Sequence, residues 1–233
     1  GELGVRGFVA AFDVNTGKTL WTYAGLSAFV QTRPLIYQGK VIFGAWDGFM
    51  YALDETNGQL QWKWQNPSAG SVLAPGQVWP VGANNKVFIA APDNRLTAID
   101  ATLGTTVWRT NTWTVRETVG LSEDQARVYA RTTANNFVAV SSLASQPQQL
   151  WLTNAGFGTD FSAAQMVEKN GTLFYGTMQA VLFALNPLTG AIKWQYKLCP
   201  TVLRTVVPLS GSRVLVPDYD GRIWWVTRFG RVG

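Results

Sequence analysis

Three arginines stand at equivalent places in this sequence and could together bind an anion. They are Arg33 in QTRP, Arg116 in VRET and Arg204 in LRTV, each directly ahead of an apolar segment. A guanidinium group presents paired N–H donors that match the geometry of a carboxylate or a phosphate. The same segments and their equivalents carry three more polar side chains, and these six residues form our candidate ligand-binding set. The other three members are Gln77, Glu117 and Asp160.

A second interpretation of this set requires no ligand. In it the arginines pair with Glu117 and Asp160 and with free backbone carbonyl groups. Acid–base catalysis would require these two carboxylates to face each other, and the sequence does not fix that geometry.

Missing residue types limit the kinds of catalytic site. The chain of 233 residues has no histidine and one cysteine, Cys199. Histidine-based catalysis, His-ligated metal sites, internal disulfides and Cys-rich zinc sites are therefore excluded. No G-x-S-x-G sequence is present, so serine hydrolase chemistry is excluded as well. We predict that this chain contributes no catalytic residue.

Composition and charge indicate a folded chain without a nucleic-acid partner. Hydrophobic residues make up 47% of the chain and charged residues 14%, with a net charge of +5. Such a composition can bury a core and is unlike that of disordered proteins. The basic residues alternate with apolar ones near the C-terminus instead of forming a nucleic-acid-binding patch. No apolar run approaches the ~18 residues of a transmembrane helix.

A repeat organises the elements that must position these side chains. Five segments join a strand, a turn and a second strand that ends in tryptophan, recurring roughly every 43 residues. Apolar residues alternate along the strands, and no helical period is sustained. The segments are VAAFDVNTGKTLW (9–21), MYALDETNGQLQW (50–62), LTAIDATLGTTVW (96–108), FVAVSSLASQPQQLW (137–151) and LFALNPLTGAIKW (182–194).

The turn and the tryptophan of each repeat have separate physical roles. An aspartate such as Asp54 can accept hydrogen bonds from backbone amides two residues on, and a glycine such as Gly58 supplies a left-handed position. The tryptophan is expected to fill the groove against the adjacent sheet, burying a large flat side chain. Trp224 and Trp225 are neighbours in a predicted strand, so they must point to opposite faces of it.

The period predicts an all-β fold, a β-propeller of four-stranded antiparallel blades. About five blades are visible, as part of a ring of about seven or eight. We treat 1–233 as a single propeller domain that is incomplete on its N-terminal side. Residues 1–24 and 201–227 are predicted to form partial blades, and the full blades are predicted at 29–66, 72–112, 115–153 and 159–198.

The pattern A-x-D-x-x-T-G-x-x-x-W resembles the PQQ-type repeat of quinoprotein-like propellers over nearly the whole chain. The stretches 115–133 and 150–177 resemble the propeller portion of bacterial proteins that also carry a calcineurin-like metallophosphoesterase domain. That domain needs histidine ligands, so the resemblance implies that any phosphoesterase activity belongs to a segment outside this sequence. The repeats and the ending DGRIWWV (220–226) more distantly resemble BamB-like propellers.

Another resemblance is local and concerns Glu2. The segment GELGVRGFVAAFD (1–13) is similar to a segment of PQQ-dependent alcohol dehydrogenases. In that family a glutamate at the position of Glu2 ligates the calcium ion that holds the quinone, and carboxylates suit Ca²⁺. The resemblance implies Glu2 as a metal ligand, with PQQ and Ca²⁺ as cofactors. The adjacent cysteine pair and a C-x-x-C-H haem motif are missing, and in the other interpretation Glu2 is only a terminal residue.

These observations lead to two functional hypotheses. The first is a non-catalytic propeller that serves as a protein-binding or scaffolding module of a bacterial cell-envelope protein, periplasmic or surface-exposed, in one version accessory to an absent metallophosphoesterase domain. It needs no cofactor, and it reaches the membrane only through an upstream anchor or a partner. A partner would dock across the mouth of the central channel or along a strand edge. The alternative is a fragment of a PQQ- and calcium-dependent quinoprotein dehydrogenase.

Overall fold

The described part of the chain is built of β-strands. The computed structural model describes residues 7–67, 78–156, 164–198, 201–227 and 230–231. Every regular element in these ranges is a strand, so the described residues include no helix that could span a membrane. The chain divides into two compact units, Gly1–Val107 and Trp108–Gly233.

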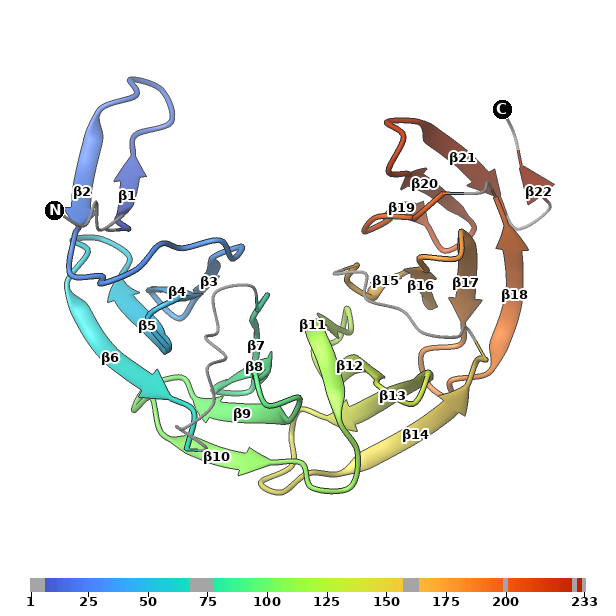
Figure 1. Ribbon diagram of the computed structural model, residues 1–233, viewed down its shortest axis with the longest axis horizontal. Coiled ribbons are helices and arrows are strands. Elements are labelled where there is room, and N and C mark those ends of the chain that lie inside the picture. The colour runs from blue at the N-terminus through green and yellow to red at the C-terminus, as the bar shows by residue number, and fades with distance from the viewer. Residues whose placement is uncertain (1–6, 68–77, 157–163, 199–200, 228–229, 232–233) are drawn as a thin grey trace, which may run out of the picture. The chain divides into compact units, whose positions relative to one another are not determined.

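Unit 1 begins with a two-stranded sheet, and four-stranded antiparallel sheets follow it (Figure 1). The two-stranded sheet pairs β1 (Val9–Phe12) with β2 (Thr19–Tyr23). The next sheet contains β3 (Leu35–Tyr37), β4 (Lys40–Gly44), β5 (Phe49–Asp54) and β6 (Leu60–Gln65). The following one, which ends at the boundary of the unit, contains β7 (Val81–Ala83), β8 (Lys86–Ala90), β9 (Leu96–Asp100) and β10 (Thr106–Arg109).

Unit 2 contains three further four-stranded sheets whose strands pair in chain order. The first is β11 (Val115–Leu121), β12 (Arg127–Thr132), β13 (Asn136–Ser141) and β14 (Gln149–Asn154). The second is β15 (Val167–Lys169), β16 (Thr172–Gly176), β17 (Val181–Leu185) and β18 (Ile192–Lys197). The third is β19 (Val207–Ser210), β20 (Arg213–Pro217), β21 (Ile223–Thr227) and β22 (Gly230–Arg231).

Three strands, β19 to β21, lie within the partial blade that the sequence predicts at 201–227. Strand β22 adds a fourth, because Thr227 pairs with Gly230 and Val226 with Arg231. Only two residues separate β21 from β22, whereas the repeat turn is longer. A search for the A-x-D-x-x-T-G spacing therefore misses this strand.

Burial follows the position of each strand in its sheet. In β4, β5, β16 and β17 nearly every residue is buried, so both faces of these middle strands are covered. Strand β21 instead alternates: Trp224 is 9% exposed and Trp225 is 39% exposed. The two adjacent tryptophans therefore point to opposite faces, as strand geometry requires.

The repeat turns share one backbone conformation. The Gly17 N–H donates to the Asp13 carbonyl at 2.8 Å, and the Gly104 N–H donates to the Asp100 carbonyl at 2.9 Å. The carboxylate of the aspartate caps the turn from within, as when Asp13 Oδ1 accepts from the Thr16 N–H at 2.7 Å. The glycines that close these turns have φ between +68° and +73°, a region that L-residues rarely adopt. They are Gly17, Gly58, Gly104 and Gly190.

Four of the repeat tryptophans donate the indole N–H to a backbone carbonyl of a later turn. Trp21 donates to Glu55 O at 2.9 Å and Trp62 to Ala101 O at 3.0 Å, within unit 1. In unit 2, Trp151 donates to Pro187 O at 2.9 Å and Trp108 to Ala144 O at 3.3 Å. These four side chains are at most 9% exposed. The indole thus buries a large apolar area while its one polar group is satisfied.

Two small residues make room for the indoles of Trp21, Trp62 and Trp151. An alanine of the preceding strand pairs directly opposite the tryptophan, as in Ala52↔Trp62 and Ala139↔Trp151, and the strand register shifts immediately after it. On the receiving turn, a Cβ atom added at Gly104 would lie 2.7 Å from the Trp62 ring. Glycine is therefore required there for space as well as for its positive φ.

This packing predicts different costs for two glycine substitutions in identical turns. Gly17 and Gly104 have φ of +68° and +69°, but nothing lies within 4 Å of a Cβ at Gly17. We expect Gly17→Ala to lower the free energy of unfolding by about 1 kcal/mol, through backbone strain alone. Gly104→Ala should cost about 1–3 kcal/mol more, because its methyl group collides with Trp62. Urea denaturation of both variants measures the difference. Equal losses of unfolding free energy would show that the Trp62 ring leaves room for a methyl group at position 104.

Candidate functional site

The structure places only part of the predicted ligand-binding set. Gln77 and Asp160 lie outside the described residues, as does Glu2, and Glu117 is described only as backbone within β11. Arg33 is exposed ahead of β3 in unit 1, while Arg116 is half-buried within β11 in unit 2. Convergence of these side chains on one anion therefore stays a prediction, and so does a catalytic carboxylate pair.

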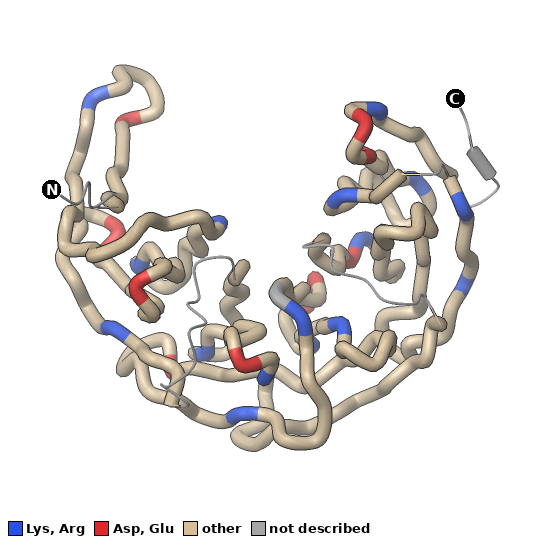
Figure 2. The backbone as a smooth tube through the Cα atoms, in the orientation of Figure 1, with Lys and Arg blue, Asp and Glu red and all other residues tan. Residues whose placement is uncertain are grey.

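Arg204 has the clearest surroundings of the predicted residues. Its guanidinium lies over the ring of Tyr219, 4.6 Å from the centroid, and its backbone N–H donates to the Pro217 carbonyl at 2.9 Å. Tyr219 is 65% exposed. The segment ahead of β19 and the turn after β20 thus present a cation stacked on an aromatic ring, an arrangement that exposes both groups to a partner. Figure 2 shows that Lys and Arg are otherwise dispersed along the backbone.

A groove of about 580 Å³ lies elsewhere in unit 2, and the sequence analysis missed it. Three elements line it: the β15–β16 turn, the outer strand β18 and the β19–β20 turn. Its lining residues are Asn170, Thr172, Lys193, Trp194, Gly211 and Ser212.

Lys193 gives the groove its positive charge. Its Nζ donates to the Gly171 carbonyl at 2.7 Å and to Thr172 Oγ1 at 3.0 Å. These two bonds fix the ammonium group on the β15–β16 turn, where Asn170 and Gly171 both have positive φ. Lys193 itself remains exposed, so an ammonium group faces whatever enters the groove.

Glu123 ties the groove to the preceding sheet. One carboxylate oxygen accepts from the Asn170 N–H at 2.6 Å, and the other lies 3.0 Å from Lys169 Nζ. The hydrogen bond from Lys169 is the main cause that lowers the pKa of Glu123 below its ordinary value. The carboxylate is therefore ionised at neutral pH, and it holds Asn170 in position at the edge of the groove.

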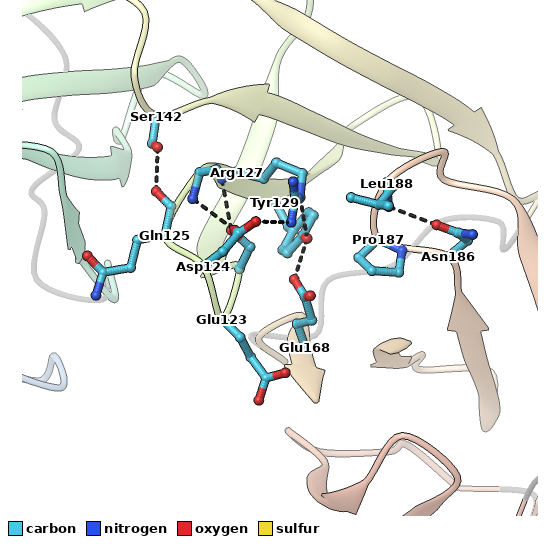
Figure 3. Close-up of polar contacts among 12 residues, drawn as sticks. Glu123, Asp124, Gln125, Arg127, Tyr129, Ser142, Glu168, Asn186, Pro187 and Leu188 are labelled. Carbon is cyan, nitrogen blue, oxygen red and sulfur yellow. Dashed lines mark hydrogen bonds and ion pairs between the residues drawn. The ribbon is translucent and has the colours of Figure 1, made fainter. Parts of the chain in front are cut away.

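A second polar network runs beside this contact (Figure 3). Asp124 accepts from Ser122 Oγ at 2.6 Å and from the Arg127 guanidinium at 2.8 Å. Arg127 Nε also donates to the Tyr129 hydroxyl at 3.2 Å, and that hydroxyl donates to Glu168 Oε2 at 2.5 Å. The network joins the β11–β14 sheet to β15.

The protonation states in this network fit a role in stabilising the fold. Burial, followed by the hydrogen bond to Glu168, raises the pKa of Tyr129 above its ordinary value, so the hydroxyl stays protonated. The hydrogen bond from Ser122 is the main cause that lowers the pKa of Asp124. Tyr129 is thus held as a donor to Glu168, and Asp124 as an ionised acceptor for Ser122 and Arg127. Within the described residues, moreover, no three His, Cys, Asp or Glu side chains gather to hold a metal ion.

One sequence signal could have located the groove. Trp194 is the last of the five repeat tryptophans, and no A-x-D-x-x-T-G turn follows it in the sequence. In the structure Trp194 is half-buried, whereas the four earlier ones are buried. A half-buried repeat tryptophan thus lies on one side of the groove.

Removing the Tyr129 hydroxyl should destabilise unit 2. In Tyr129→Phe, Glu168 loses a donor and Arg127 loses an acceptor in a partly buried place, which should cost about 1–2 kcal/mol of unfolding free energy. Tyr219→Phe is the matched control, because Tyr219 is exposed, and it should change stability by less than about 0.5 kcal/mol. Urea unfolding of unit 2 compares them, and equal stability of the two variants would contradict a supporting role for the network.

Stability should also fall in acid partly through Asp124. Because folding lowers its pKa, its contribution is present above the ordinary pKa and is lost as the pH falls through the folded-state value. The carboxylate is about half exposed, at 54% of its side-chain surface, so the contribution is small, about 0.5 kcal/mol. Asp124→Asn should therefore lower stability slightly at pH 7 and leave it unchanged at pH 2. Urea titrations at both pH values test this, and an equal loss at both would show that the charge is not involved.

Comparison with known proteins agrees with the repeat geometry. The family described as "Outer membrane protein assembly factor BamB" matches residues 3–74, 63–148 and 139–230. BamB of Bordetella pertussis is 24% identical over 95% of this chain and 58% of its own length. The quinohemoprotein alcohol dehydrogenase of Comamonas testosteroni is 26% identical over 82% of this chain and 30% of its own length.

Solved structures show the same fold at low identity. The crystal structure of BamB from Moraxella catarrhalis matches with a TM-score of 0.72 at 19% identity, over 96% of this chain and 67% of that one. The computationally designed Ika8 protein matches with a TM-score of 0.74 at 16% identity, over 95% of this chain and 65% of that one. The chain spans between about a third and three fifths of the first two curated relatives. The predicted all-β propeller fold is confirmed, and the chain belongs to the PQQ-repeat propeller family described as outer membrane protein assembly factor BamB.

Proposed function

We propose that this chain is a non-catalytic, protein-binding module of a bacterial cell-envelope protein. The observation that carries the proposal is the exposed Tyr219 with the Arg204 guanidinium stacked on it at 4.6 Å. Tyrosine, tryptophan and arginine are enriched among the few residues that carry most of the binding energy in protein interfaces. The chain also carries a net charge of +5, which favours a partner with acidic side chains beside apolar ones.

Family membership supports this proposal. The relatives from Bordetella pertussis and several other bacteria bear the name outer membrane protein assembly factor, so a role in a protein assembly of the envelope is the natural expectation. The same relationship supports a periplasmic or surface-exposed location, with membrane association through an anchor or a partner. Where the whole protein carries a metallophosphoesterase domain, the propeller would act as its accessory.

Site-specific photocrosslinking tests the binding role. A photoreactive phenylalanine derivative in place of Tyr219 should crosslink the native full-length protein to a discrete partner in the envelope fraction. The charge reversal Arg204→Glu in the same protein should reduce that product at least fivefold. The control position is Leu103, which is 67% exposed in unit 1. Equal crosslinking from both positions, or none from Tyr219, would overturn the proposal.

The dehydrogenase alternative has one specific observation in its favour, the similarity to the Comamonas testosteroni enzyme. It requires Glu2 to hold Ca²⁺ and PQQ. We expect the chain mixed with PQQ and Ca²⁺ to retain no quinone absorbance after gel filtration. A stoichiometric chromophore that disappears in Glu2→Gln would establish the alternative instead.

A further inference from the structure

Two asparagines in this chain, Asn57 and Asn170, are followed directly by glycine. An Asn-Gly sequence can lose ammonia without an enzyme, because glycine has no side chain to shield its backbone nitrogen from the asparagine side chain. Asn57 lies in the repeat turn between β5 and β6, and Asn170 lies in the turn between β15 and β16. Both asparagines are exposed, so exposure alone does not distinguish the two sites.

The fold engages both reacting groups of the Asn57 turn. The Gly58 N–H donates to the Asp54 carbonyl at 2.9 Å. The side-chain oxygen of Asn57 accepts from the Gln59 N–H at 2.8 Å. Gly58 is also buried, and a Cβ atom added to it would lie 2.5 Å from the Trp21 ring. The nitrogen and the side chain therefore cannot meet unless hydrogen bonds break and the turn moves against an indole.

The Asn170 turn leaves the same two groups unengaged. Within the part of the chain that the structure describes, the Gly171 N–H has no recorded acceptor and the Asn170 side chain has no recorded partner. Gly171 is exposed, and nothing lies within 4 Å of a Cβ atom added to it. The bonds that hold this turn use other atoms. Glu123 accepts from the Asn170 backbone N–H at 2.6 Å, and Lys193 donates to the carbonyl of the next residue at 2.7 Å.

We propose that Asn170 is a site of non-enzymatic deamidation in the folded protein. The Gly171 nitrogen attacks Cγ of Asn170: the N–Cγ bond forms, the Cγ–Nδ2 bond breaks, and ammonia leaves with the proton of the attacking N–H. The product is a five-membered succinimide ring. Water then opens the ring at Cγ, which gives aspartate, or at the backbone carbonyl carbon, which gives isoaspartate. One water molecule is consumed and one ammonia is released, with no change of oxidation state.

The two products affect the turn differently. Aspartate keeps the backbone path and adds a carboxylate to a groove that Lys193 also lines, so the new charge is opposite to that of the ammonium. Isoaspartate inserts one methylene group into the backbone of a two-residue turn whose flanking residues, Lys169 and Thr172, pair directly. Hairpin register depends on loop length. The isoaspartyl form should therefore lose this pairing and release the Asn170 N–H from Glu123.

Ageing of the purified chain in mildly alkaline buffer, followed by peptide mapping with mass spectrometry, tests the site. Asn170 should convert at least about tenfold faster than Asn57, because Asn57 must first break two hydrogen bonds. In the urea-denatured chain the two sites should react at similar rates, since the difference comes from the fold. Equal rates in the folded chain would overturn the proposal. A difference that persists in urea would do so as well, because it would come from local sequence.

Asn170→Gln is the matched variant for the chemistry. Glutamine suits this turn, because Gln38 and Gln125 have φ of 50° and 59° and Asn170 has φ of 46°. Its side chain is one methylene longer and would have to close a larger ring, so product at position 170 should disappear while Asn57 reacts as before. Product that forms at position 170 at the parent rate would overturn the proposed succinimide route.

The aged chain also provides a test of the structural consequence. Deamidation removes one unit of net positive charge, so ion exchange separates the products from the parent chain. The isoaspartyl form should unfold at a lower urea concentration than the parent and the aspartyl form, because it has lost the bond to Glu123. An isoaspartyl form that is as stable as the parent would contradict the predicted release of the turn.

Discussion

Within each unit, the contact on which neighbouring sheets depend is an indole that covers the next repeat turn and donates its N–H to that turn, as at Trp21, Trp62 and Trp151. Strand edges and flat sheet faces have few surface features, so their shape alone does not define how two sheets pack. Tryptophan supplies a large apolar surface with one directional donor, so the contact fixes position as well as burial. The acceptor is available because the turn's internal hydrogen bonds use the carbonyl and carboxylate of Asp13, Asp54 or Asp100 and leave the next carbonyl free. The alanine, the aspartate and the glycine of the repeat are each required by this one contact.

The same contact explains what could be predicted from the sequence. Spacing between tryptophans locates the strands, and the Asx and glycine positions locate the turns, because both depend on local geometry. The repeat that departs from the pattern between Ser141 and Gln149 still provides an acceptor, Ala144, although its distance to Trp108 is the longest of the four, at 3.3 Å. Strand β22 could not be found in this way, since its two-residue connection lacks the repeat turn altogether.

The candidate sites were harder to predict, for physical reasons. The groove combines a turn, an outer strand and a turn of the next sheet, and Glu123 reaches Asn170 across 47 positions of sequence. The periodicity of apolar residues identifies strands, but it does not show which turns of neighbouring sheets lie close together. The sequence places the predicted arginines at equivalent positions, and among them Arg204 has a contact, its stacking on Tyr219, that suggests how it would meet a partner. The proposed binding surface lies where a turn adds an exposed aromatic ring, at Tyr219.

The most direct test of the central contact is hydrogen exchange of the indole N–H groups, followed by NMR on one sample. If each indole is bonded to the next turn, the Nε1 protons of Trp21, Trp62 and Trp151 should exchange orders of magnitude more slowly than that of the exposed Trp225. Exchange of these three protons as fast as that of Trp225 would mean that the indoles are not bonded to the turns and do not hold the sheets together.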